Sequence, residues 1–540
     1  MNNIADPNNQ SQIPPQQPMP QGGAFVPPMQ QGGMFMPPAP PAPMTRRARW
    51  GKRLMAGKAL ITNSLPDWFA TYAFVTYLVA LLGVNIVYSS NGTEWYFWLV
   101  GIGWVAVFFF LSVKFSKEWS VLKMRKPKAF EEKLFWTGFG IRVAYVVFSY
   151  NFYMVMTGQP FEFAFGDSLG YTETAQWFSE EWGRDNLWST LSEFCKSSFS
   201  DIGYPLFMLI PIRLFDMPFV QFVIRIFHAF FGAYTAVVLY RLTSRSMEET
   251  TARLTAIFCM LHPVLICYCG LTLKEVFMTW LLVVFIDMAD RLLRNRKYAF
   301  STIAPMVLAG GALFMFRTVL GLVAFMAVFF SLVMMDAKIV NWGRKVVLGL
   351  VLAGAILLGA SDNIMREVNK IRNADVRQEQ ETSMTMRYGS EKGGKLSGNR
   401  FANYAGAAVF APLIFTIPFP TMVNPGFQED MRLIHGGNWM RNVMSGFVIL
   451  AMVMLLLTGD WRQYTLPLSA LLGYLVVLVF SSFAHSLRFH IPVMPFEMMF
   501  AAYAITNMRK KHKTWYVIWC LLCIVMCFGW NWMKLRGRGL

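Results

Sequence analysis

Residues 95–113 read WYFWLVGIGWVAVFFFLSV and contain no charged side chain. A helix needs about 20 mainly apolar residues to cross the hydrocarbon core of a bilayer, so this stretch predicts a membrane-spanning helix. The composition of the whole chain agrees, because 55% of its 540 residues are hydrophobic and only 15% are charged. A soluble domain carries about 25% charged residues. The sequence therefore predicts a helical membrane protein.

Comparable apolar runs recur along the chain and predict an all-α, polytopic transmembrane bundle of about 13 spans. The expected spans are 69–89, 94–115, 134–156, 219–241, 253–271, 274–292, 299–316, 318–335, 344–361, 442–458, 464–483, 489–506 and 514–531. Two further apolar segments, 204–215 and 407–420, are too short to span. We expect both to lie as helices in the membrane interface.

Composition divides the chain into five parts. Residues 1–60 form a Pro- and Gln-rich tail that should be disordered and that includes a basic juxtamembrane segment, TRRARWGKR. Residues 61–133 add two spans and a basic loop, and residues 134–361 form a transmembrane core with a first outer loop at 157–218. Residues 362–441 form a second long outer loop, whose Gly-rich part predicts a mobile flap, and residues 442–540 hold the last spans.

The basic loops predict the orientation, because Lys and Arg gather in short cytoplasmic loops. The basic loops are KFSKEWSVLKMRKPKAFEEK (114–133), RLLRNRKY (291–298) and NMRKKHK (507–513). Placing them and the N-terminus in the cytoplasm leaves Asp167, Lys274, Arg317 and Arg488 on the opposite face. The same rule explains the net charge of +18 without a nucleic-acid partner. The C-terminal MKLRGRGL would then end outside, against the rule.

The first outer loop is acidic, and Asp167 follows the apolar run FEFAF at the membrane boundary. Outer loops lack Lys and Arg in any case, which explains the missing cations but not the position of Asp167. A carboxylate held against apolar surface is desolvated, and desolvation raises its proton affinity and suits it to act as a general base. We therefore expect Asp167 to carry chemistry.

Charged residues from distant parts of the chain fall on the same predicted face as Asp167. They are Lys274 and Glu275 at the start of a span, Arg317 between two spans, and Arg488 and His490 in HSLRFHIPVMP. Each alone could be a side chain that reaches the membrane surface from a helix end. Together, the cations could hold a phosphate while a carboxylate activates a hydroxyl. This pattern predicts a site for an anionic, membrane-embedded substrate.

The order of several stretches resembles the GT-C superfamily of polytopic glycosyltransferases, in particular the branch of the protein O-mannosyltransferases and the lipid A aminoarabinose transferase. The stretches include GDSLGYTETAQWF, GYPLFMLIPIRLF, FRTVLGLVAF and LRFHIPVMPFEMMFAAYAI, and they cover roughly residues 134–506. The closest local matches are Asp-x-x-x-Tyr (Asp167 to Tyr171) and Arg-x-x-x-Pro-x-x-Pro (Arg488 to Pro495).

The resemblance implies a GT-C-like fold, a polyprenyl-phosphate-linked sugar as donor and inverting transfer on the non-cytoplasmic face. It implies Asp167 as the catalytic base, with Lys274, Arg317, Arg488 and His490 binding the lipid phosphate and Glu275 as an accessory residue. Tyr171 and Glu173 would orient the sugar. Many relatives pair two acids in the catalytic loop, whereas Ser168 follows Asp167 here, so Glu162 or Glu173 would supply a second carboxylate.

Several points stay open at this stage. The sequence identifies no certain cofactor and does not decide metal dependence, although an acidic loop could hold Mg²⁺ or Mn²⁺. The sugar is not specified, and the acceptor could be a glycan, a lipid or a protein. We expect a multi-pass protein of a bacterial inner membrane with its active site on the periplasmic or extracellular face. The alternatives are a transporter or flippase of lipid-linked saccharide, which should show internal repeats and broken helices at the bilayer midplane, and a non-catalytic membrane scaffold.

Overall fold

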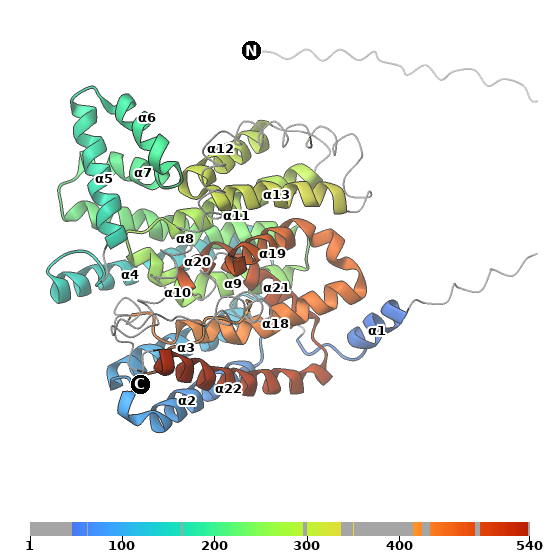
Figure 1. Cartoon of the computed structure of the whole chain (residues 1–540). Helices are drawn as coiled ribbons and strands as arrows, with labels where there is room; N and C mark the ends of the chain where they lie inside the picture. Colours follow the sequence, from blue (N-terminus) through green and yellow to red (C-terminus); the bar gives the residue numbers. More distant parts are fainter. Residues whose placement is uncertain are drawn as a thin grey trace, which may run out of the picture. The chain divides into compact units, whose positions relative to one another are not determined.

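The computed structural model describes residues 46–61, 63–163, 166–294, 300–335, 349, 414–423, 433–480 and 486–537. Within these ranges the chain forms helices packed side by side (Figure 1), and its only β-pairing is two isolated bridges. The predicted all-α class is therefore confirmed. The basic segment of the predicted tail forms helix α1 (Arg46–Met55), whereas residues 1–45, the expected span 344–361 apart from residue 349, and the expected flap lie outside the described residues.

Seven helices of the described part are long and apolar enough to cross a membrane. They are α2 (Asp67–Val87), α3 (Trp95–Glu118), α4 (Pro127–Thr157), α8 (Phe219–Ser244), α18 (Gly437–Thr458), α19 (Thr465–Phe480, preceded by the 3₁₀ turn η5, Asp460–Tyr464) and α22 (Lys513–Gly537, preceded by η7, Lys510–His512). Helices α9 (Glu249–Leu261) and α10 (Pro263–Cys267, continued by a 3₁₀ turn to Gly270) meet at a bend of 52°, and together they are long and apolar enough to form an eighth, broken span or a re-entrant loop. The polytopic helical fold is supported, but the count of 13 spans is not confirmed.

The remaining expected spans are helical but short, charged or broken. Residues 274–292 form α11 (Glu275–Arg294), while α12 (Phe300–Phe316) and α13 (Thr318–Met334) have 17 residues each. The expected span 489–506 is divided into α20 (Leu487–His490), the 3₁₀ turn η6 (Ile491–Val493) and α21 (Met494–Asn507). Proline explains this break, because Pro492 and Pro495 lack the N–H groups that a continuous helix would need.

The bend between α9 and α10 is stabilised by a buried cation. Pro263 opens α10, so the last carbonyls of α9 lose their helical donors. Arg142 of α4, fully buried, donates hydrogen bonds to the carbonyls of Cys259 (3.4 Å) and Met260 (3.1 Å). A guanidinium thus replaces the backbone donors that the bend removes.

The charged end of α11 is tied to α8 by ion pairs. Arg245, just after α8, contacts Asp287 (2.6 Å) and Asp290 (3.0 Å) of α11, and both carboxylates are almost fully buried. Arg291 and Arg294 pair with the same two acids one turn away along α11. Because every carboxylate here has cationic partners, the end of α11 can be buried despite its charge.

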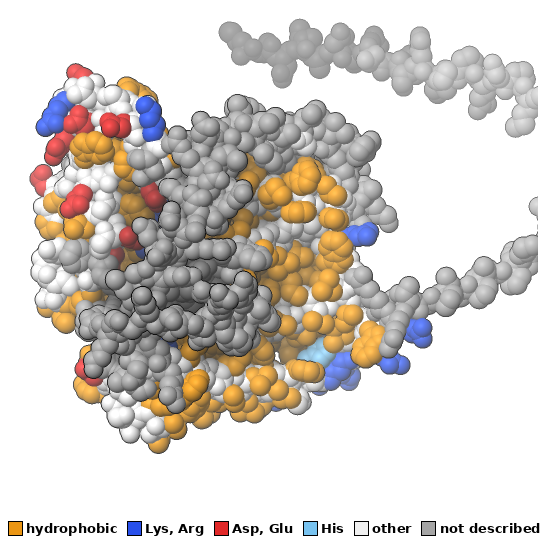
Figure 2. Space-filling model, in the orientation of Figure 1, with side chains coloured by type: hydrophobic (Ala, Val, Ile, Leu, Met, Phe, Trp, Pro, Cys, Tyr) orange, Lys and Arg blue, Asp and Glu red, His pale blue; other side chains and the backbone are white. Residues whose placement is uncertain are grey.

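The first outer loop is a small helical layer. It contains α5 (Gly166–Gly183), α6 (Leu187–Ser198), the 3₁₀ turn η2 (Phe199–Asp201) and α7 (Gly203–Leu214). Helix α7 matches the helix expected at 204–215, and its exposed Ile210 and Leu214 suit a membrane interface. Figure 2 shows carboxylates gathered over α5 and α6.

The second expected interfacial helix, at 407–420, is not a helix where the structure describes it. Residues 414–420 form a turn, a bend and irregular backbone, and Pro418 and Pro420 disfavour helical hydrogen bonding there. Side chains satisfy the backbone instead: Arg441 donates to the carbonyls of Ile414 and Ile417, and Asn531 donates to the carbonyl of Pro420. This part of the prediction is wrong because long-range side-chain contacts replace local helical ones.

Helices α18 and α22 touch closely at Gly446. The indole of Trp519, whose Nε1 donates to the carbonyl of Asn442 (3.1 Å), occupies the space where a Cβ on Gly446 would lie. We expect Gly446→Ala to lower the free energy of unfolding by about 1–3 kcal/mol through overpacking. Gly103→Ala is the matched control, because no atom lies within 4 Å of a Cβ at this helical glycine. Unfolding of both variants in mixed detergent micelles checks the prediction, and equal stabilities would contradict it.

Candidate functional site

Arg488 joins three parts of the chain that lie far apart in sequence. Its Nε donates to Oε1 of Glu275 at the start of α11, and one terminal nitrogen donates to Oδ2 of Asp167 in the first turn of α5. The Glu275 side chain is 1% exposed and the Asp167 side chain 59% exposed. The arginine therefore bridges a buried carboxylate and one that is open to solvent.

Lys274 forms a second ion pair beside the first. Its ammonium donates to Oδ1 of Asp201 in η2 and lies 5.7 Å from the centre of the Tyr171 ring. Burial lowers the pKa of Lys274 from the ordinary 10.5, and Asp201 opposes that shift. Burial, followed by the charges of Asp201 and Glu275, raises the pKa of Tyr171 well above its ordinary value. The Tyr171 hydroxyl therefore keeps its proton at neutral pH.

Arg317 completes the group of cations. It lies between α12 and α13 in extended conformation (φ −165°), and its guanidinium stacks over the ring of Phe489 at 4.3 Å. Phe489 follows Arg488 directly, so the three predicted phosphate-binding cations gather at one end of the bundle. Arg317 has no ion-pair partner in the described part of the chain, unlike Lys274 and Arg488.

The structure differs from the expectation for Asp167. We expected a carboxylate held against apolar surface, but its side chain is largely exposed and paired with Arg488. Helix α5 starts at Gly166, so Asp167 is its second residue, and its carboxylate accepts a hydrogen bond from Arg488. The second oxygen, Oδ1, has no partner among the described residues, so it is open to an approaching hydroxyl.

His490 points into the bundle instead of toward the outer face. It is fully buried, and its Nδ1 accepts a hydrogen bond (2.8 Å) from Arg441 of α18. Arg441 also forms two hydrogen bonds with Glu497 of α21, at 2.8 and 2.9 Å. His490 is therefore placed to orient α20, and direct phosphate binding, which we expected of it, does not fit this geometry.

Glu162 lies beneath α5. Its carboxylate accepts a hydrogen bond from the hydroxyl of Ser168, and both side chains are buried. Through Ser168, the residue after Asp167, a more distant carboxylate thus reaches the first turn of α5. Glu173, in contrast, is exposed on α5 and does not contact the ion pairs.

A buried chain of hydrogen bonds supports the site from below. Thr172 of α5 accepts from Gln221 of α8 (3.0 Å), Gln221 accepts from Thr272 (2.7 Å), and Thr272 accepts from Arg225 of α8 (3.4 Å). Thr272 lies two residues before Lys274, so this chain fixes α5 and the Lys274 loop relative to each other. The sequence analysis did not single out Arg225, although a charged residue inside an apolar span is the usual sign of a functional region.

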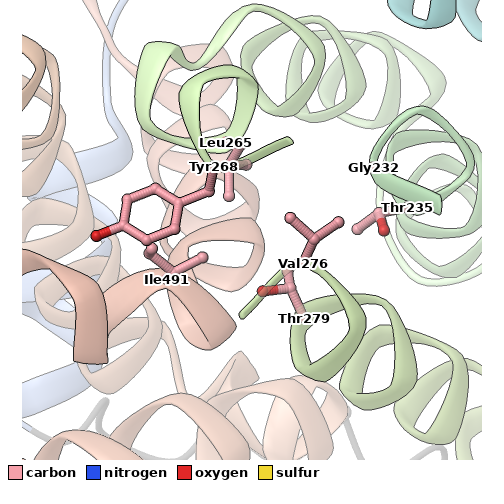
Figure 3. Close-up of a pocket in the computed structure, with 7 residues that line it drawn as sticks. All are labelled: Gly232, Thr235, Leu265, Tyr268, Val276, Thr279 and Ile491. Atoms are coloured by element: carbon pink, nitrogen blue, oxygen red, sulfur yellow. The ribbon is translucent and has the colours of Figure 1, made fainter. Parts of the chain in front are cut away.

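A small cavity lies between α8, α10, α11 and η6 (Figure 3). Its volume is about 10 Å³, and it is lined by Gly232, Thr235, Leu265, Tyr268, Val276, Thr279 and Ile491. This is about the space that one water-sized sphere needs, so this cavity cannot enclose a sugar.

The described residues do not form a preorganised metal-binding site. They contain no group of three or more His, Cys, Asp or Glu side chains placed to hold an ion. The carboxylates of the cluster, Asp167, Asp201 and Glu275, are each paired with a cation. A role for Mg²⁺ or Mn²⁺ remains a prediction.

Comparison with known proteins gives one match. Residues 432–537 match the Alg9-like mannosyltransferase family. The matched part contains α18 to α22, and with them Arg441, Arg488, His490 and Glu497. No curated protein and no solved structure matches the chain.

Proposed function

We propose, from the similarity of residues 432–537 to the Alg9-like mannosyltransferases, that this chain is a membrane glycosyltransferase that takes its sugar from a polyprenyl-phosphate-linked donor. The match confirms the resemblance to GT-C glycosyltransferases and supports the class of enzyme; the donor, the base and the membrane face belong to the proposal. The observation that carries the proposal is the contact of Arg488, inside the matched residues, with Asp167, outside them.

The cations would bind the phosphate of the donor. Arg317 has no carboxylate partner in the described structure, and Lys274 and Arg488 hold carboxylates that a phosphate could displace. Charge-assisted hydrogen bonds from Arg and Lys to phosphate oxygens are among the strong polar contacts in proteins. The same cations would stabilise the negative charge on the leaving phosphate, so the phosphate could leave without a general acid.

Donor binding would also release the base. A phosphate that takes over Arg488 frees Asp167 from its ion pair at the moment when the donor is in place. Asp167 would then accept the proton of an acceptor hydroxyl while that oxygen attacks the anomeric carbon and the bond from this carbon to the phosphate oxygen breaks. Attack from the face opposite the phosphate inverts the anomeric centre. Tyr171, which keeps its proton, would donate a hydrogen bond to the sugar.

The cluster would lie at the non-cytoplasmic surface of the membrane. It sits at the end of the bundle opposite the turns 119–126, 245–248 and 508–513, and the first and last of these turns lie within two of the basic loops of the sequence. The positive-inside rule assigns basic loops to the cytoplasm. The polyprenyl tail would remain among the lipids and the acceptor would approach from the aqueous side, past α5.

A transporter of lipid-linked saccharide is the second candidate, and the bent span supports it. Broken helices at the bilayer midplane are typical of transporters, and α9 and α10 meet at 52°. However, the carbonyls freed at this bend are already satisfied by Arg142, and the exchangeable ion pairs lie at one end of the bundle. These two observations favour the enzyme.

The decisive experiment is transfer in vitro. The purified chain is incubated with a panel of polyprenyl-phosphate sugars, sugar nucleotides as alternative donors, and glycan, lipid and peptide acceptors, with and without a chelator. Release of polyprenyl phosphate together with a glycosylated product supports the proposal. Activity with sugar nucleotides alone, or movement of a donor across a vesicle membrane without its cleavage, would contradict it.

The affinity for donor should depend on pH through Lys274. Only the charged lysine attracts phosphate, and burial lowers its pKa from 10.5. As pH rises through this lowered pKa, the charge is lost, so donor affinity should fall at a lower pH than for an exposed lysine. Lys274→Arg should move the fall to higher pH, because arginine stays charged. Donor binding to both forms as a function of pH tests this, and coincident profiles would count against a role for Lys274.

A further inference from the structure

A second concentration of positive charge lies at the opposite end of the bundle, where α1 meets the turn before α22. The backbone N–H of Lys510 donates to the carbonyl of Lys58 (3.1 Å), and the Lys511 ammonium donates to the carbonyl of Arg53. These contacts bring together two segments separated by about 450 residues of sequence. Figure 2 shows Lys and Arg side chains gathered here.

The cations of this region have no acidic partners. We call them the basic surface; it consists of Arg49, Lys52, Arg53, Lys58, Arg509, Lys510, Lys511 and Lys513. None of them forms an ion pair in the described part of the chain. By contrast, Arg245 and Arg294 at the same end are paired with Asp287 and Asp290. The basic surface therefore attracts anions from outside the chain.

Two buried hydrogen-bond donors at the basic surface, the Nε of Arg509 and the Nε2 of the neighbouring His512, lack acceptors among the described residues. The backbone N–H of Arg509 donates to Nδ1 of His512 (3.1 Å), so a neutral His512 carries its hydrogen on Nε2. That Nε2 and the Nε of Arg509 are buried and have no partner among the described residues, and the His512 side chain is only 3% exposed. A buried donor without an acceptor is unfavourable by about 1–3 kcal/mol, and an anion oxygen that reached either group would remove this penalty.

Two exposed tryptophans place the basic surface at the level of lipid headgroups. Trp50 of α1 is 56% exposed and Trp515 of α22 is 68% exposed. Tryptophan is enriched where a membrane protein crosses from hydrocarbon to water, because its ring is apolar and its N–H is polar. An anion that meets this surface therefore belongs to the membrane.

We propose that the basic surface binds the phosphate headgroups of anionic phospholipids, with the lysines as counter-charges and Arg509 and His512 as direct donors. Binding would stabilise the contact of α1 with the start of α22 and hold this end of the bundle at the membrane surface. This role is separate from sugar transfer, because it uses none of the residues of the Arg488 cluster.

Equilibrium binding to the full chain in neutral detergent tests the proposal. The probes are short-chain phosphatidylglycerol, short-chain phosphatidylcholine and inorganic phosphate. Phosphatidylglycerol should bind, and neither of the other two should compete at the same concentration. A lysine near an anionic surface contributes about fivefold in affinity. Lys52→Gln and Lys510→Gln, one from each segment, should each weaken binding about fivefold, and together about 25-fold.

Lys126→Gln/Lys128→Gln is the matched control, since it removes two exposed cations from another loop at the same end. It should leave the affinity unchanged. An equal loss in this control would show that the lipid responds only to overall charge and would overturn the proposal. Equal binding of phosphatidylcholine, or full competition by inorganic phosphate, would overturn it as well. All the substituted lysines are exposed, and elution of the variants at the wild-type position in gel filtration confirms their folding.

Discussion

Replacement of Asp167 by asparagine is expected to lower kcat for sugar transfer by a factor of about 10²–10⁴, the usual contribution of a general base. The change keeps the shape of the side chain but removes its charge and its capacity to take a proton. Donor affinity should stay the same or increase, because Arg488 loses a competing carboxylate while it keeps Glu275. Single-turnover kinetics and donor binding, measured separately, distinguish the two quantities.

The control for this variant is Glu180→Gln, which neutralises another exposed acid of α5 and should leave kcat unchanged. If Asp167 only holds α5 against Arg488, the asparagine variant would lose donor affinity and keep its kcat. A folded Asp167→Asn protein with the wild-type rate would exclude Asp167 as the base.

Replacement of Arg441 by methionine is expected to reduce the free energy of unfolding by about 3–5 kcal/mol, the range found when one partner of a buried ion pair is removed. The Arg441 side chain is fully buried and Glu497 is 3% exposed, so the variant leaves an uncompensated carboxylate in the bundle. It also removes the donors for the carbonyls of Ile414 and Ile417. Detergent-mediated unfolding measures the loss.

The double variant Arg441→Met/Glu497→Met should recover most of the stability, because a buried pair can be replaced by apolar side chains with little loss. It should stay below wild type by about 1–3 kcal/mol through the carbonyls left unpaired. Arg184→Gln breaks an exposed ion pair with Glu181 and should change stability by less than about 1 kcal/mol. A single Arg441 variant as stable as this control would contradict the buried-pair explanation.

Much of the fold could be predicted from the sequence, because apolar length alone identifies helices such as α2, α3 and α8. The failures have physical causes. Residues 489–506 are apolar enough to span, but Pro492 and Pro495 break the helix. Residues 414–420 are apolar as well, but their backbone is satisfied by Arg441 and other side chains of distant helices. No local pattern contains such contacts.

The gathering of the cations could be predicted by assigning Lys274, Arg317 and Arg488 to one membrane face. The orientation of individual side chains could not. Asp167 pairs with an arginine that lies 321 residues later in the chain, and the buried His490 accepts a hydrogen bond from Arg441 of another helix. The buried pair of Ser168 and Glu162 depends on the fold between them, and only the structure reveals it.

The balance of charge in the cluster has a consequence for how a donor arrives. The three cations Lys274, Arg317 and Arg488 are equal in number to the three carboxylates Asp167, Asp201 and Glu275, so the cluster itself projects little electric field beyond the Debye length, about 8 Å at physiological ionic strength. If the donor is the proposed lipid-linked phosphate, this cluster would not attract it over long distances. Such a donor would arrive by lateral diffusion in the bilayer, and attraction would begin when its phosphate can exchange with a carboxylate. Its rate of encounter should then depend on the two-dimensional concentration of the lipid and little on the ionic strength of the medium.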